Sequence, residues 1–143
     1  MKRYLSLAIM AGLAYACLSG TLEREAEGGK KVDTRVFELR TYYAHPGKME
    51  ALHARFRDHT NKLFVKHGMT LIGYWNPTDA KGAQEKLIYI LAYPSKEAAD
   101  KSWAGFRSDP DWNAARAKSE EKGPLVAKVE SVFMNPTDYS PIK

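Results

Sequence analysis

The chain has a single cysteine, Cys17, so it cannot form an internal disulfide. It also lacks a long hydrophobic run, because the apolar stretch from Tyr4 to Ala16 is shorter than the roughly 20 residues of a membrane-spanning helix. Neither a disulfide-stapled fold nor a spanning helix in that stretch is therefore expected. Aromatic residues make up 11% of the 143 residues, which favours a folded domain over a disordered chain.

A segregated positive charge is missing as well. The chain has 22 Lys and Arg against 17 Asp and Glu, and the two signs are interspersed along the sequence. A nucleic-acid backbone is normally bound by a stripe or patch of like positive charge. We therefore expect no nucleic-acid partner.

Motifs of nucleophilic and metal catalysis are absent too. The sequence has no Gly-x-Ser-x-Gly elbow and no glycine-rich loop that could cradle a phosphate. Its four histidines are spaced by eight, six and eight residues, so no pair has the i,i+4 spacing of a helical zinc site. No metal is expected. These histidines are His45, His53, His59 and His67.

The N-terminus has the pattern of an export signal. Lys2 and Arg3 precede the apolar stretch, and Ala14-Tyr15-Ala16 fits the small-x-small rule for cleavage. We predict a signal peptide at residues 1–16 and a protein that is periplasmic, membrane-anchored or secreted.

Cys17 directly follows this cleavage site, which leaves two alternatives. The first is acylation of Cys17 as in a bacterial lipoprotein, although a lipobox normally has Leu in place of Ala14 and a small residue in place of Tyr15. The second is a soluble exported protein with a free thiol. Residues 17–34 are charged and contain glycine, which is typical of a flexible tether.

The rest of the chain, residues 35–134, has the periodicities of one α+β domain, followed by a tail at 135–143. Strands are predicted from Arg35 to Tyr43, 69–75, 86–93 and 125–134, with a turn-rich loop at 76–83. One helix should run from Pro46-Gly47-Lys48 to about His67 and two more should begin at Ser95 and Asp109. The inner face of the first helix is predicted to comprise Met49, Leu52, Phe56, Thr60 and Leu63.

This order is the βαββαβ order of a ferredoxin-like antiparallel sheet with its helices on one face. The other sheet face would then be exposed although it carries many apolar and aromatic groups. A second copy of the chain should cover it and close a dimeric α/β barrel, so a homodimer is expected.

Alternation along the first strand predicts which side chains line that barrel. Phe37, Leu39 and Thr41 should face the helices, which leaves Glu38, Arg40 and Tyr42 on the lining. If Val129 and Phe133 of the last strand also face the helices, Lys128 and Glu130 of that strand face the lining. The predicted ligand-binding set is Glu38, Arg40, Tyr42, Lys128 and Glu130.

Two interpretations of these charges compete. In the first, Glu38 pairs with Lys128 and Arg40 with Glu130, within one subunit or across the dimer, because charges in a closed interior must be neutralised. In the second, the charges bind an acidic or polar ligand, or burial raises the pKa of a glutamate so that it acts as a base.

Several motifs occur in an order that resembles the NIPSNAP domain. They are Val36-Phe37-Glu38-Leu39-Arg40-Thr41-Tyr42 with Pro46-Gly47-Lys48, Lys66-His67-Gly68-Met69 with Gly73-Tyr74-Trp75, Leu91-Ala92-Tyr93, and Asp109-Pro110-Asp111-Trp112. The resemblance implies a dimeric α/β barrel of the ferredoxin-like group, in a family without one agreed chemistry.

Three functions follow as hypotheses. The first is an exported binding module for a small apolar or polar ligand or for a protein, without a cofactor. The second is a cofactor-independent monooxygenase or isomerase acting on a small aromatic or polyketide-like molecule, with Glu38, Arg40 or His59 assisting. The third is haem handling through His59, by analogy with related barrels.

Overall fold

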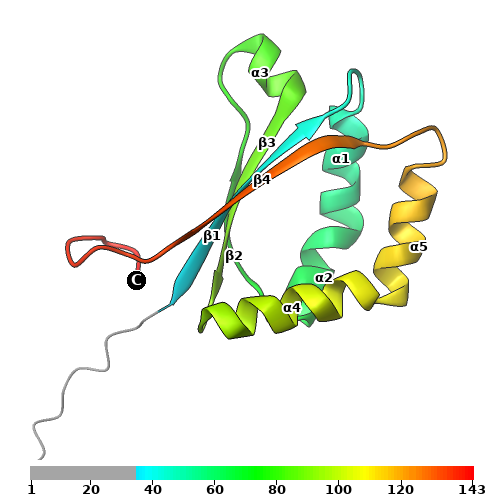
Figure 1. Cartoon of the computed structure of the whole chain (residues 1–143). Coiled ribbons are helices and arrows are strands. Elements are labelled where there is room, and N and C mark those ends of the chain that lie inside the picture. Colours follow the sequence, from blue (N-terminus) through cyan, green and yellow to red (C-terminus); the bar gives the residue numbers. More distant parts are fainter. Residues whose placement is uncertain (1–34) are drawn as a thin grey trace, which may run out of the picture. The chain divides into compact units, whose positions relative to one another are not determined.

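The computed structural model describes residues 35–143 (Figure 1). The predicted signal peptide at residues 1–16 and the tether at 17–34, with Cys17, lie outside these residues. Among the helices of the described part, none combines the length and the apolar character needed to cross a bilayer.

Four strands form one antiparallel sheet: β1 (Val36–Ala44), β2 (Thr70–Trp75), β3 (Lys86–Tyr93) and β4 (Val126–Met134). Their order in the sheet is β2-β3-β1-β4, so β1 lies in the interior with β3 and β4 on either side. This topology confirms the predicted ferredoxin-like βαββαβ fold.

The main helices cover one face of the sheet (Figure 1). They are α1 (Met49–Arg55), the π-helix η1 (Phe56–Thr60), α2 (Asn61–Lys66), α4 (Lys96–Ser108) and α5 (Pro110–Ser119). The long first helix predicted from the sequence therefore contains a π-helical turn. There the Thr60 hydroxyl donates a hydrogen bond to the Arg55 carbonyl at 3.1 Å, which satisfies a polar group at the irregular turn.

A short helix, α3 (Ala80–Glu85), occupies part of the segment that was predicted to be a loop. Asp79 begins it, because its carboxylate accepts a hydrogen bond from the Gly82 backbone N–H at 2.7 Å. The prediction of an irregular loop at 76–83 was wrong in this detail, since the N-cap residue was not recognised.

The predicted helix boundaries are otherwise confirmed. Gly68 follows α2 with a φ of +79°, a left-handed conformation that glycine adopts without strain. Ser95 caps α4 by accepting a hydrogen bond from Ala98 N–H at 3.1 Å, and Asp109 caps α5 in the same way from Asp111 N–H at 2.8 Å.

The core lies between the helices and the sheet and is rich in aromatic rings. All five residues of the predicted inner face of the first helix are buried, as are Trp103 and Phe106 of α4. Phe56 meets Tyr89 edge to face at 5.3 Å, and Phe64 meets Trp103 in the same way at 5.4 Å.

The facing of β1 is the reverse of the prediction. Glu38 opposes Leu91 of β3 and Phe133 of β4 and lies on the helix side, whereas Phe37 and Leu39 lie on the open side. Both faces of β1 carry apolar residues, so alternation could not choose between them. The helix side is the favourable one for Glu38, because a buried carboxylate needs hydrogen-bond donors. These donors come from α4 and from the neighbouring strands on that side.

The open face of the sheet is largely apolar. It carries Leu39, Ile88 and Ile90 at its centre, and Val132 and Trp75 expose 54% and 49% of their surface. Near the end of β4, residues 135–142 of the tail and the sheet together line a hollow of about 280 Å³.

Candidate functional site

The carboxylate of Glu38 is the centre of a buried polar cluster on the helix side of the sheet. The residue is only 1% exposed. Its Oε2 accepts hydrogen bonds from the Tyr93 hydroxyl and from Trp103 Nε1, each at 2.7 Å. Its Oε1 accepts from the Ser131 hydroxyl at 2.6 Å and from Arg40 Nη1 at 2.5 Å. Four donors thus occupy both oxygens.

These contacts keep Glu38 ionised. Burial by itself raises its pKa, but the hydrogen bonds from Ser131 and Tyr93 and the charge of Arg40 outweigh burial, so the pKa lies below the ordinary value of 4.5. The prediction of a glutamate with a raised pKa is therefore wrong for Glu38. A carboxylate that already accepts four hydrogen bonds is suited to positioning its donors.

Arg40 is the residue that Glu38 positions most directly. Its guanidinium lies over the Trp103 ring, 4.2 Å from the centroid, and 5.6 Å from that of Tyr42. The side chain is 15% exposed, and its Nε has no hydrogen-bond partner among the described residues although it is buried. Glu38 and the two rings thus hold a cation in a fixed orientation.

A cavity of about 310 Å³ opens beside this cation, between the sheet and helices α4 and α5. Trp103 and Phe106 line it from α4, and Trp112 and Arg116 line it from α5. From the sheet side, Arg40 and Tyr42 of β1 and Val129 of β4 are among the residues that line it. The cavity therefore combines aromatic surface with fixed positive charge.

A second buried cation, Arg55 at the end of α1, lines the same cavity. Its side chain is 4% exposed, and its Nη1 donates to Glu120 Oε1 at 2.9 Å and to the Ser119 hydroxyl at 3.3 Å. Burial raises the pKa of Glu120, but its hydrogen bond from Arg55 and the charges of Arg55 and Arg116 outweigh burial and lower it below 4.5.

Sequence reasoning did not select Arg55, Trp112 or Glu120 as site residues. One signal was available, because Arg55 stands between Leu52 and Phe56 on the apolar side of its helix. A charged residue at such a position must find a partner in the interior. Trp112 and Glu120 carry no comparable signal, since their meeting with Arg55 depends on how α5 packs against α1.

The structure divides the predicted ligand-binding set between the two faces of the sheet. Glu38, Arg40 and Tyr42 lie on the helix side, whereas Lys128 and Glu130 lie on the open side. The predicted pairs between these groups are wrong for this reason. Glu38 instead pairs with Arg40, and Lys128 Nζ contacts Glu130 Oε1 at 2.6 Å.

The candidate residue His59 lies away from both groups. It is exposed on η1 and lines a separate groove with Asp58, Lys62 and Asp111. Within residues 35–143, no three histidine, cysteine or acidic side chains gather closely enough to hold a metal ion.

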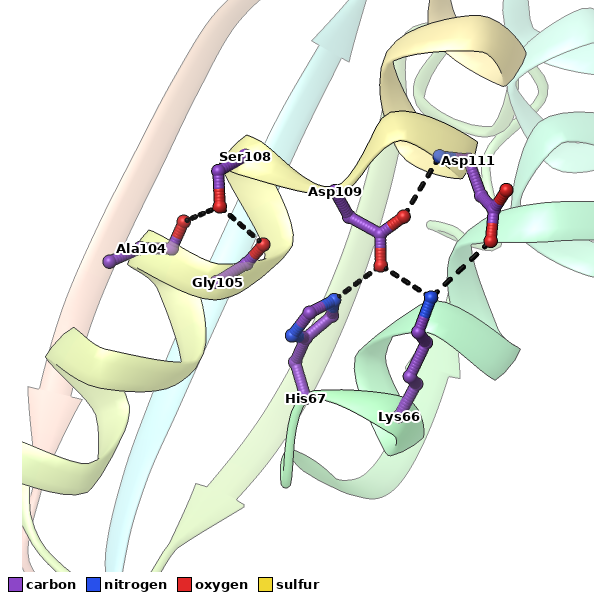
Figure 2. A network of polar contacts seen from close by, with 7 residues as sticks. All are labelled: Lys66, His67, Ala104, Gly105, Ser108, Asp109 and Asp111. Atoms are coloured by element: carbon purple, nitrogen blue, oxygen red, sulfur yellow. Dashed lines mark hydrogen bonds and ion pairs between the residues drawn. The ribbon is translucent and has the colours of Figure 1, made fainter.

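His67 belongs to a polar network that joins the end of α2 to the junction of α4 and α5. Figure 2 shows Asp109 at its centre, where Oδ2 accepts from His67 Nε2 at 2.6 Å and from Lys66 Nζ at 2.8 Å. These two hydrogen bonds, with Lys66 the stronger influence, hold the pKa of Asp109 well below its usual value. A Cβ at position 105 would approach His67 Nδ1 to 2.8 Å, so Gly105 makes room for the ring. His67 therefore has a structural contact with Asp109, which ties the end of α2 to the start of α5.

The sheet order, the one-sided helices and the cavity between them define an α+β domain of the ferredoxin-like type. The NIPSNAP family model matches residues 37–141. The chain therefore belongs to the NIPSNAP family. No curated protein matches the chain significantly.

Several solved structures similar to the chain carry the same family name. A NIPSNAP family protein of unknown function from Agrobacterium tumefaciens is 21% identical with a TM-score of 0.66, over 78% of this chain and 96% of that one. A NIPSNAP-like domain protein from Burkholderia xenovorans is 20% identical with a TM-score of 0.65, over 76% and 90% of the two chains. At these identities the likeness shows the fold alone.

Proposed function

We propose that this NIPSNAP family protein is an exported homodimer that binds a small molecule in the cavity beside Arg40. The observation that carries the proposal is the arrangement of that cavity, where a buried carboxylate fixes a cation against an aromatic wall. Concave sites with mostly apolar lining and a few fixed polar groups are typical of small-molecule binding. This location replaces the barrel lining on the open face that the sequence predicted.

The apolar open face of the sheet is the reason for proposing a dimer. Ile88, Ile90 and Val132 form part of an apolar surface that the described helices do not cover. A second copy laid face to face would bury this surface in a closed, symmetric pair. The cavity lies on the opposite face, so each subunit would keep its own site.

The catalytic alternative remains a prediction. A cofactor-independent monooxygenase or isomerase needs a base, and the lowered pKa and four donors of Glu38 do not favour it in that role. The haem alternative depends on His59, which lines a groove separate from the cavity. An exported protein–protein interaction module is also still a prediction, as are the cleavage after residue 16 and the acylation of Cys17.

The test is native mass spectrometry of the full chain, produced in an exporting host and purified without added ligand. We expect a dimer with a reproducible retained mass. Val129→Trp, which places a large ring at the cavity wall, should abolish the retained mass. Val65→Trp is the control, because Val65 is 59% exposed on α2 and does not line the cavity. Equal retention by both variants would contradict the location of the site.

A further inference from the structure

We infer that the ligand of this cavity is a planar aromatic carboxylate of one or two rings. The inference rests on the proposed function and adds the chemical class of the ligand. It follows from the charge of the cavity, its unused hydrogen-bond donors, its aromatic walls and its size.

The charge of the cavity is positive. Four of its lining residues are cations, and Glu120 is its one acidic lining residue in the described part of the chain. Glu38 contacts Arg40 from behind the wall and neutralises part of that charge. An excess of positive charge remains, and it favours an anionic ligand. The four cations are Arg40, Arg55, Arg107 and Arg116.

Two arginines of the cavity wall also carry a donor that nothing in the described residues uses. The Nε groups of Arg40 and Arg55 are buried and lack a hydrogen-bond partner there. A buried N–H without a partner destabilises the fold, so a guanidinium that turns this donor toward an acceptor in the cavity would relieve that cost. A guanidinium matches the two oxygens of a carboxylate, which can accept two parallel hydrogen bonds.

Aromatic rings supply the remaining wall. Phe106 and Trp112 lie with centroids 4.4 Å apart, and Trp103 meets Phe106 edge to face at 5.7 Å. Arg55 lies over Trp112 at 5.3 Å, as Arg40 lies over Trp103. Each buried cation is therefore next to a large flat ring. A flat ligand with a carboxylate on its edge could contact a ring and a guanidinium together.

Size and electrostatics narrow the class further. The volume of about 310 Å³ lies at the lower end for ligand pockets, which favours one or two rings over a larger molecule. Phosphate groups are often held at a helix N-terminus, but Asp109 already caps that end of α5. Arg116 and Glu120 instead lie at the C-terminal end of α5, where the helix dipole opposes an anion and therefore disfavours a dianion more than a singly charged carboxylate.

The experiment is isothermal titration calorimetry of the full chain with three probes of one shape. They are 2-naphthoate, the neutral 2-naphthamide and the dianionic 2-naphthyl phosphate. We expect 2-naphthoate to bind at least about tenfold more tightly than either of the others. Val129→Trp should abolish this binding.

Two arginines of similar exposure provide a matched pair. Arg116 lines the cavity and Arg57 does not, and their side chains are 60% and 62% exposed. Each is paired with one glutamate, and Glu120 keeps its hydrogen bond from Arg55 when Arg116 is replaced, so both substitutions by Gln should leave the fold intact. Arg116→Gln should weaken 2-naphthoate binding by roughly threefold to tenfold, and Arg57→Gln should not change it.

The outcomes separate this inference from the function on which it rests. Equal binding of the naphthamide, still abolished by Val129→Trp, would overturn the anionic class while the cavity stays the binding site. Tighter binding of the naphthyl phosphate would overturn the carboxylate. Failure of all three probes would overturn the inference, and a chain that also retains no mass in native mass spectrometry would overturn the proposed function with it.

Discussion

Trp103 Nε1 donates a hydrogen bond to Glu38 Oε2 at 2.7 Å, and this bond joins helix α4 to the sheet across the wall of the cavity. An indole N–H can only donate, and so can the guanidinium of Arg40 on the other carboxylate oxygen. Each oxygen of Glu38 therefore faces one group that cannot accept. An ionised carboxylate satisfies both donors, whereas an amide cannot.

The first prediction concerns Glu38→Gln. In either orientation, the NH₂ group of the amide faces the donor of Trp103 or that of Arg40, and neither can accept a hydrogen bond. The buried positive charge of Arg40 also loses its anionic partner. We expect the free energy of unfolding to fall by about 3 kcal/mol, as for other broken buried ion pairs. Urea denaturation at one fixed protein concentration measures this change.

Glu50→Gln is the control for this prediction. Glu50 also pairs with an arginine, Arg57, but its side chain is 81% exposed. Its substitution should leave stability unchanged within error. Similar losses in the two variants would show that the Glu38 cluster does not stabilise the fold.

The second prediction concerns pH. The folded-state pKa of Glu38 is below its ordinary value of 4.5, so its contribution to stability is complete above about pH 4.5 and is lost as pH falls through the folded pKa. The stability difference between the wild type and Glu38→Gln should therefore narrow below pH 4.5. Denaturation curves from pH 3 to 7 measure it, and a difference that stays constant over that range would contradict an ionised Glu38.

The third prediction concerns the dimer. Val132 on the open sheet face and Val65 on α2 expose 54% and 59% of their surface. Val132→Asp would place a charge in the proposed interface and should give a monomer, whereas Val65→Asp should leave a dimer. Light scattering coupled to size-exclusion chromatography measures both masses. A dimer of Val132→Asp would count against an interface on the open face.

The fourth prediction concerns the network of Figure 2, in which both Asp109 and Asp111 contact Lys66. The Asp109 side chain is 2% exposed and also holds His67 and the first turn of α5, whereas that of Asp111 is 72% exposed. Asp109→Ala should lower the melting temperature by several degrees, and Asp111→Ala should change it little. A larger loss for Asp111→Ala in thermal unfolding would contradict this assignment.

Much of the fold could be predicted because it depends on local signals. The inner face of the first helix follows from spacing, and Gly68, Ser95 and Asp109 stop or start helices through their own backbone and side-chain chemistry. Cap residues and periodicity are properties of neighbouring residues. They can be recognised without knowledge of tertiary contacts.

The site could be predicted only in part because its residues depend on distant partners. Glu38 and Arg40 were selected as candidates on the first strand, but the wrong face was assigned to them. That face is decided by Trp103 and Ser131, which lie 65 and 93 residues further along the chain. A strand with apolar residues on both faces does not by itself indicate which face is buried.

The most direct test of a binding site beside Arg40 is a ¹H–¹⁵N correlation spectrum of the full chain during titration with 2-naphthoate. The chain has three tryptophans, and their indole N–H signals can be assigned by single replacements with Phe. Trp103 and Trp112 line the cavity, whereas Trp75 lies on the open face of the sheet. We predict that the signals of Trp103 and Trp112 shift on titration while that of Trp75 stays in place. A shift of Trp75 alone would place the ligand on the open face and contradict the site beside Arg40.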